Sequence, residues 1–260
     1  MINKKNKYSL FWDRFKSNRR NLYSLYIFSF IFTLSLFAEV ISNDKPIMMS
    51  IDDKIYIPIL ISYPETEFGG IFDTEANYKD SFMSRVYNEN DNWAIFPFNP
   101  HSYNSINLDN ATPNPASPSS YNYLGTDDRG RDVLARLIYG FRLSVIFAFI
   151  LTLIGVIVGI FFGAIQGYFA GRTDLYLQRF IEIWSSMPEL YILIIFSSLF
   201  EPSILLLIIL LSLFGWMGLS DYVRAEFLKG RNMEYVIAAR TMGLSNSQII
   251  LKHILPNSMV

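Results

Sequence analysis

The longest uncharged run in this sequence covers residues 143–171, which is 29 residues without Asp, Glu, Lys or Arg. A helix rises about 1.5 Å per residue, so roughly 20 residues cross the hydrocarbon core of a membrane. Two shorter uncharged runs, 21–38 and 202–220, precede and follow it. These runs indicate an all-α integral membrane protein, and a large soluble protein with buried helices is the less favoured alternative.

The uncharged runs and one amphipathic apolar segment between them predict the membrane spans. The predicted spans are residues 21–41, 142–171, 175–200 and 202–224. The third span carries Arg179, Glu182 and Glu189, so it either lines a polar path or begins at the membrane surface. Glu182 and Glu189 are therefore candidate path-lining residues.

Lysine and arginine are distributed unevenly around these spans. Residues 1–20 hold seven basic residues and one acid, residues 42–142 hold eight basic and fourteen acidic, and residues 221–260 hold five basic and three acidic. Cytoplasmic loops carry the excess of Lys and Arg. We therefore predict a basic cytoplasmic N-terminus at 1–20, an extracytoplasmic segment at 42–124 and a cytoplasmic C-terminal segment. The first apolar stretch has no Ala-x-Ala site and is expected to stay as an anchor.

Composition excludes several classes of function. With 51% hydrophobic and 17% charged residues, the chain is not intrinsically disordered. Its net charge of −1 gives no basic excess for nucleic acid. The absence of cysteine excludes disulfides and thiolate zinc sites. We expect no metal site, because the acids in 52–75 match no calcium-loop spacing and His101 has no obvious partner ligands.

The segment between the first two spans is rich in turn-forming residues. Residues 55–61 are apolar and favour an edge strand, although Pro58 weakens that prediction. Residues 111–120 are rich in Pro and Ser and cannot be helical throughout. Residues 125–141 predict a short helix before the second span, capped by Thr126 or Asp127.

Near the C-terminus, residues 232–256 predict two short helices joined at a tight corner. Gly243 is expected to end the first helix in the left-handed conformation, and Ser245 with Gln248 forms a capping box for the second. Pro256 lies near the expected end of that second helix. The pattern fits a docking element at 229–260 and equally a hairpin on the membrane surface. One face of the first helix is expected to hold Tyr235, Ala238, Ala239 and Met242.

Two motifs resemble those of a known family. The first reads Gly-Thr-Asp-Asp-x-Gly-Arg-Asp-Val-Leu-x-Arg over 125–136. The second reads Tyr-Val-x-Ala-Ala-Arg-x-x-Gly over 235–243, with Leu-Pro-Asn at 255–257. They resemble, respectively, the motif before the second span and the "EAA" loop of permease subunits of dipeptide and oligopeptide ABC importers, most closely the Yej-type associated with peptide and microcin C uptake. Ile237 and His253 depart from the pattern.

The resemblance implies a type I importer permease in a bacterial inner membrane. It also implies a second permease subunit, an extracytoplasmic peptide-binding protein and a cytoplasmic ABC ATPase that uses the ATP. This chain has no P-loop sequence, so it is expected to be neither an enzyme nor the holder of a cofactor. The residues implied to couple to the ATPase are Tyr235, Ala238, Ala239, Arg240, Gly243, Leu255 and Pro256. The residues of the first motif are Gly125, Thr126, Asp127, Gly130, Arg131, Asp132 and Arg136.

The resemblance also leaves alternatives open. The family usually has six spans, so the fifth and sixth are missing, and either the sequence is incomplete or the product is a truncated, non-transporting fragment. A membrane-anchored extracytoplasmic binding or sensor protein is a second reading. A membrane enzyme is a third, with Glu39, Glu182 and Glu189 as candidate groups.

Overall fold

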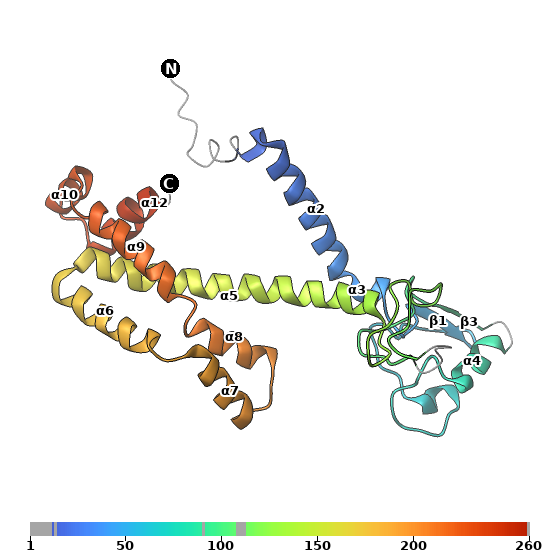
Figure 1. Ribbon diagram of the computed structural model, residues 1–260. Helices are drawn as coiled ribbons and strands as arrows, with labels where there is room; N and C mark the ends of the chain where they lie inside the picture. Colours follow the sequence, from blue (N-terminus) through green and yellow to red (C-terminus); the bar gives the residue numbers. More distant parts are fainter. Residues whose placement is uncertain (1–11, 13–14, 90–91, 108–112, 259–260) are drawn as a thin grey trace, which may run out of the picture. The chain divides into compact units, whose positions relative to one another are not determined.

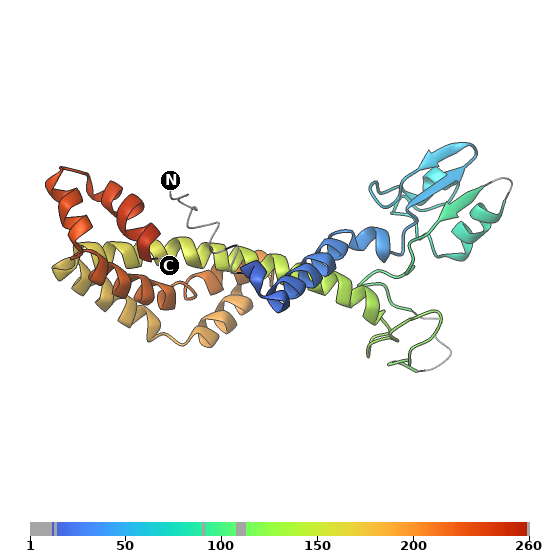
Figure 2. The same cartoon turned by 90° about the horizontal axis from the view of Figure 1, so that it is seen from above.

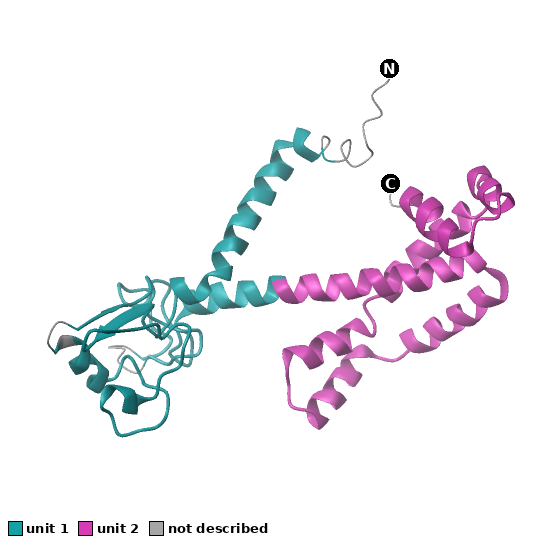
Figure 3. Cartoon of the chain, turned by 180° about the vertical axis from the view of Figure 1, so that it is seen from behind, with its two compact units in different colours: residues 1–145 teal, residues 146–260 magenta. Residues whose placement is uncertain are grey.

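The computed structural model describes residues 12, 15–89, 92–107 and 113–258. Most of the predicted basic N-terminus at 1–20, and residues 111 and 112 of the Pro/Ser segment, therefore lie outside the described residues. The chain divides into two compact units, residues 1–145 and 146–260 (Figure 3).

The first unit begins with helix α2, Arg19–Leu36, and the short helix α3, Ala38–Ile41. The side chain of Asn18 caps α2 by accepting a hydrogen bond from the backbone N–H of Arg20 at 3.2 Å. At 1.5 Å per residue α2 is about 27 Å long. Its apolar side chains are mostly exposed, but α2 is not among the described helices that are long and apolar enough to cross a membrane. The predicted span 21–41 thus corresponds to α2 and α3 together.

A small sheet follows the first two helices (Figure 1). Strand β1, Met48–Ile51, lies between β2, Lys54–Tyr56, and β3, Trp93–Ile95, and pairs with both in antiparallel register. As predicted, the apolar stretch at 55–61 contributes to an edge strand, and that strand stops two residues before Pro58. Helix α4, Ser81–Asn88, and the 3₁₀ turn η1, Glu65–Phe68, complete this part. Its core consists of Met49, Ile51, Tyr56, Phe68, Ala76, Tyr78 and Met83.

Helix α5, Val133–Phe169, is 37 residues long and includes the predicted span 142–171 except its last two residues. The short helix predicted over 125–141 differs from the structure, in which residues 125–132 form a turn. Gly125 and Gly130 have φ of +76° and +79° there, values that other residues rarely adopt. The cap is also different, because the Asp132 carboxylate accepts the backbone N–H of Ala135 at 2.8 Å.

The second unit continues with α6, Gly171–Ser185, and α7, Glu189–Leu199, which are bent by 65° relative to each other. Helices α8, Ile204–Ser212, and α9, Met217–Gly230, follow. Within the described part of the chain, α5 and the stretch Ile204–Gly230 are long and apolar enough to cross a membrane. The bent pair α6–α7 makes a third crossing if it counts as one span. The four-span arrangement remains a prediction.

Helices α5 and α9 pack closely because glycines on α5 face the backbone of α9. A Cβ added to Gly163 would lie 2.5 Å from the carbonyl oxygen of Ser220, and one added to Gly167 would lie 2.6 Å from that of Arg224. Small residues at this spacing allow two membrane helices to approach each other. Helix α6 is held to α9 as well, because Arg224 Nε lies 2.5 Å from Asp174 Oδ1.

The chain ends in four short helical pieces that we call the helical corner, residues 234–258. They are α10, Glu234–Thr241; α11, Asn246–Gln248; the π-helix η2, Ile249–Ile254; and α12, Leu255–Ser258. Figures 1 and 2 both show these pieces beside the C-terminal end of α5 and the end of α9. We call α10 the first arm of the corner, and α11, η2 and α12 together its second arm. Pro256 lies inside α12, so the second arm continues through it. Proline cannot donate the usual backbone hydrogen bond, and the wider turns of η2 precede it.

Candidate functional site

The helical corner has its own buried core, shared with the ends of two membrane helices. Phe227 of α9 and Val236 of α10 are fully buried, and Ile254 of η2 is nearly so. The apolar contacts fix the corner to α9 and α5 as one packed body. The buried residues of this cluster are Ala164, Tyr168, Phe227, Val236, Ala239, Ile249 and Ile254.

The turn of the corner follows the local rules that the sequence predicted. Gly243 has φ of +79°, and its N–H donates to the carbonyl of Arg240 at 3.0 Å. The N–H of Leu244 donates to the carbonyl of Ala239 at 3.2 Å, which completes a Schellman C-cap. Ser245 and Gln248 form the predicted capping box. The two arms are therefore held at a fixed angle by backbone hydrogen bonds.

The four residues predicted to share one face of the first arm lie on two different faces in the structure. Tyr235 and Met242 are 39% and 72% exposed, and Ala238 is exposed beside them. Ala239 instead turns inward with Val236 and is fully buried. The helical period explains this, because residues three apart share a face. Ala239 thus packs the corner onto its support, whereas Tyr235, Ala238 and Met242 form its outer surface.

The remaining residues implied by the second motif have different surroundings. The Arg240 guanidinium carbon lies 5.6 Å from the centre of the Tyr168 ring, a cation–π contact. Leu255 is half-buried against the corner's core, and Pro256 is exposed. Tyr168 itself is 4% exposed, and its hydroxyl donates to Asn246 Oδ1 at 2.8 Å. Sequence reasoning missed Tyr168, because it belongs to an apolar helix where nothing in the pattern distinguishes it.

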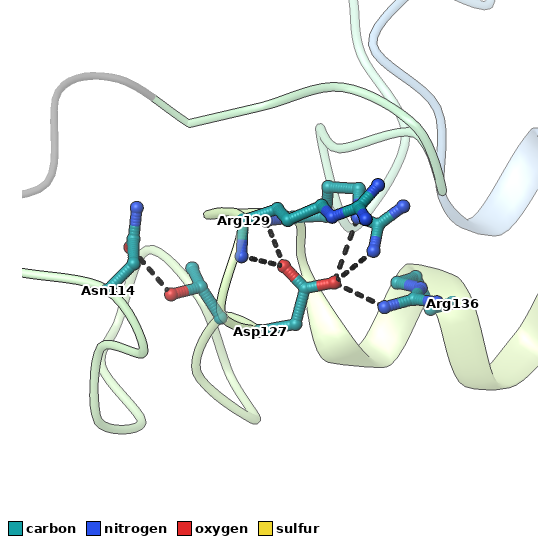
Figure 4. Close-up of polar contacts among 6 residues, drawn as sticks. Asn114, Asp127, Arg129 and Arg136 are labelled. Carbon is teal, nitrogen blue, oxygen red and sulfur yellow. Dashed lines mark hydrogen bonds and ion pairs between the residues drawn. The ribbon is translucent and has the colours of Figure 1, made fainter.

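In the first motif, the Asp127 carboxylate forms hydrogen bonds and ion pairs with the neighbouring arginines (Figure 4). Its carboxylate accepts the backbone N–H groups of Arg129 at 3.0 Å and Arg131 at 2.9 Å. The guanidinium groups of Arg131 and Arg136 pair with its other oxygen. Burial raises the pKa of Asp127, but the hydrogen bonds from Arg131 and Arg129 outweigh it and lower that pKa to about 2. Asp127 therefore closes the turn and stays ionised at neutral pH.

The glycines and threonine of this motif shape the same turn. The Thr126 hydroxyl donates to Asn114 Oδ1 at 2.9 Å and accepts the N–H of Ala116 at the same distance. A Cβ on Gly130 would lie 2.6 Å from Asn114 Nδ2, and one on Gly125 would collide with the carbonyl of Ala116. The motif thus ties the Pro/Ser segment to the start of α5.

Asp132 holds a second, buried junction at the N-terminus of α5. It is 1% exposed and accepts hydrogen bonds from Asn99 Nδ2 at 2.8 Å and Asn122 Nδ2 at 2.9 Å, besides capping the helix. Asn99 also bonds Ser42, and the Tyr139 hydroxyl donates to the Ser42 carbonyl at 2.9 Å. Four separate stretches of chain thus meet at Asp132. No local pattern distinguishes Asn99 or Asn122 from the many other asparagines around them.

The acids considered for catalysis or path lining each have their own surroundings within their unit. Glu39 forms a two-pronged pair with Arg142, with both N–O distances 2.8 Å. Glu182 pairs with Arg179 at 2.6 Å, one turn away on α6, and Glu189 begins α7 as an exposed residue. The pair with Arg142 gives the Glu39 carboxylate a structural role in holding α3 to the start of α5.

His101 is buried and has partners within the first unit. Its Nε2 lies 3.1 Å from the carbonyl oxygen of Tyr121, and its Nδ1 lies 3.2 Å from Lys79 Nζ. Burial lowers the pKa of His101, and the neighbouring Lys79 charge lowers it further. A neutral ring that donates from Nε2 and accepts at Nδ1 fits both contacts. The histidine therefore supports the packing of the outer segment.

The second unit thus holds the packed parts of α5 and α9, with the helical corner beside their ends. The family described as binding-protein-dependent transport system inner membrane component matches residues 155–260, which include the whole helical corner. A second family, the N-terminal TM domain of oligopeptide transport permease C, matches residues 8–58.

Individual relatives extend these matches over nearly the whole chain. The inner membrane ABC transporter permease protein YejE of Escherichia coli is 46% identical over 249 residues, which are 96% of this chain and 73% of the relative. The peptidoglycan transport system permease protein YejE of Agrobacterium fabrum is also 46% identical, over 96% of this chain and 71% of the relative. The oligopeptide transport system permease protein OppC of Haemophilus influenzae is 38% identical, over 63% and 51% respectively. The chain belongs to this family of inner-membrane ABC transporter permeases.

Proposed function

We propose that this chain is a permease subunit of an ATP-driven peptide importer and couples to a cytoplasmic ATPase through its helical corner. The corner carries the proposal. It is rigid inside, fixed to α5 and α9, and exposed on its outer side at Tyr235, Ala238 and Met242. The names of the relatives, which refer to oligopeptides and to peptidoglycan, support peptides or peptide-bearing molecules as the transported class.

The proposed partners follow from the proposed topology. The N-terminus and the helical corner face the cytoplasm, where the corner docks on an ABC ATPase that binds and hydrolyses the ATP. The segment 42–124 faces outward, where a peptide-binding protein delivers substrate. A second permease subunit completes the path, and Glu182 and Glu189 on α6 and α7 are proposed to contribute to its lining.

We propose that movement passes from the corner into the membrane through packed side chains. When the ATPase pair closes, its groove displaces the outer face of the corner. Phe227 and the corner's core carry the displacement to α9, and α9 passes it to α5 along the glycine contacts. Close-packed interiors transmit displacement rather than absorb it. ATP hydrolysis on the partner thus drives alternating access without chemistry in this chain.

Replacing Gly243 by Val tests the coupling role. The left-handed conformation costs a residue with a Cβ about 1–2 kcal/mol, so the corner opens in a fraction of molecules. The penalty raises the ratio of open to closed corners roughly tenfold, as 1.4 kcal/mol corresponds to a factor of ten. We therefore expect ATP-driven transport in the complete importer to fall, while membrane insertion is unchanged. Uptake of labelled peptide by proteoliposomes measures the change.

The matched control is Gly218→Val. Gly218 lies in α9 with ordinary helical φ and no atom within 4 Å of an added Cβ. Gly243 has equally open space, so the two variants differ in backbone conformation rather than in steric conflict. Transport that is equal in the two variants would count against a coupling role for the corner.

A further inference from the structure

One side chain of α5 touches both arms of the helical corner. Tyr168 lies in the last turn of α5, and its ring is buried in the cluster that includes Phe227 and Val236. Its ring faces Arg240, which precedes the turn at Gly243, and its hydroxyl bonds Asn246, which follows that turn. Tyr168 is therefore in contact with both arms, so movement of either arm would displace its side chain.

The neighbouring residue fixes α5 at the same level. A Cβ on Gly167 would collide with Phe227, so the backbone of α5 rests directly on α9 one residue before Tyr168. The corner is covalently continuous with α9 but not with α5. Tyr168 supplies direct polar contacts between the end of α5 and the corner, a hydrogen bond of 2.8 Å and a cation–π contact of 5.6 Å.

We propose that Tyr168 is a positioning residue that passes movement of the helical corner directly into α5, through its hydrogen bond to Asn246. The inference rests on the proposed coupling of the corner to an ATPase. It adds a second route into the membrane, because α9 already moves with the corner through the peptide chain. Two membrane helices would then respond together to one docking surface.

Two substitutions remove the bond from opposite sides. Tyr168→Phe keeps the buried ring and the Arg240 contact but loses the hydroxyl. Asn246→Ala removes the acceptor at an exposed position, where folding is little affected. Tyr176→Phe, on the exposed side of α6, is the matched control.

The readout is the response of each helix to nucleotide in the full complex, purified from its native membrane with its ABC ATPase. This chain has no cysteine, so Ile157→Cys on α5 or Tyr222→Cys on α9 gives it a single site for a spin label. The probe is ATP with vanadate, which traps the closed ATPase. The glycine contacts with α9 still move α5, so loss of one coupling hydrogen bond is expected to make the α5 response smaller by up to about fivefold, whereas the α9 response is expected to persist.

The outcomes separate the inference from the proposed function. Tyr168→Phe, Asn246→Ala and the double variant should weaken the α5 response equally, since all remove one bond. An undiminished α5 response in the variants would overturn the inference. Equal losses of response at α5 and α9, or loss of the ATPase from the variant complex, would overturn it as well, because either result indicates a merely structural role. If the unsubstituted complex holds no ATPase, or neither helix responds, the proposed function fails instead.

Discussion

Replacing Asp132 by Ala is expected to destabilise the first unit by roughly 3–5 kcal/mol, from two orphaned amide N–H groups and one lost helix cap. Asn99 Nδ2 and Asn122 Nδ2 both donate to this carboxylate, and both asparagines are buried. Alanine leaves one N–H of each amide without its acceptor, although Asn99 Nδ2 keeps its bond to Ser42 Oγ, and removes the cap at the backbone N–H of Ala135. The junction that joins three other stretches of chain to α5 then opens.

Thermal unfolding of the detergent-purified chain, with limited proteolysis of 42–124, measures this effect. Asp128→Ala is the control, because Asp128 is in the same motif, is exposed and carries the same charge. We expect a large fall in melting temperature and rapid cleavage for Asp132→Ala, and little change for Asp128→Ala. Equal behaviour of the two variants would show that the Asp132 junction does not hold the unit together.

Replacing Gly167 by Ala is expected to cost about 3 kcal/mol, the upper part of the range for overpacking. The new methyl group would lie 2.6 Å from the carbonyl oxygen of Arg224 and would collide with the Cβ of Phe227. Backbone and Cβ atoms cannot rotate away, so α5 and α9 must separate. The helical corner, which shares Phe227, loses its support at the same time.

Gly140→Ala is the control on the same helix, since no atom lies within 4 Å of its added Cβ. Alanine there favours the helix by about 0.5–1 kcal/mol. The melting temperature in detergent should therefore fall for Gly167→Ala and stay equal or rise for Gly140→Ala. A Gly167→Ala protein as stable as the parent would mean that α5 and α9 do not pack as described.

Local rules were enough to predict the features that depend on neighbouring residues. Gly243 and the Ser245–Gln248 pair act through hydrogen bonds within a few residues, and the structure confirms both. Uncharged runs located α5, because length and hydropathy alone decide whether a helix suits a membrane. The resemblance to importer permeases is confirmed by the relatives.

Features that depend on distant residues were not predicted. Glu39 and Arg142 are 103 residues apart in sequence and pair only because the fold brings α3 beside α5. The residue that caps the helix is Asp132 and not Thr126 or Asp127. Asp127 is instead bonded to the arginines of the turn. Ala239 faces inward because the end of α9 lies beneath it. None of these partners stands close enough in sequence to leave a local pattern.

Cross-linking from the outer face of the helical corner tests the central claim most directly. The chain has no cysteine, so Met242→Cys, at a side chain that is 72% exposed, gives one thiol for a photoactivatable cross-linker in native membranes. Leu60→Cys, 80% exposed in the segment proposed to face outward, is the control. We predict that Met242→Cys captures a protein with a P-loop sequence, identified by mass spectrometry, and that Leu60→Cys does not. Labelled Met242→Cys that captures no ATPase, or capture from both positions alike, would contradict the account.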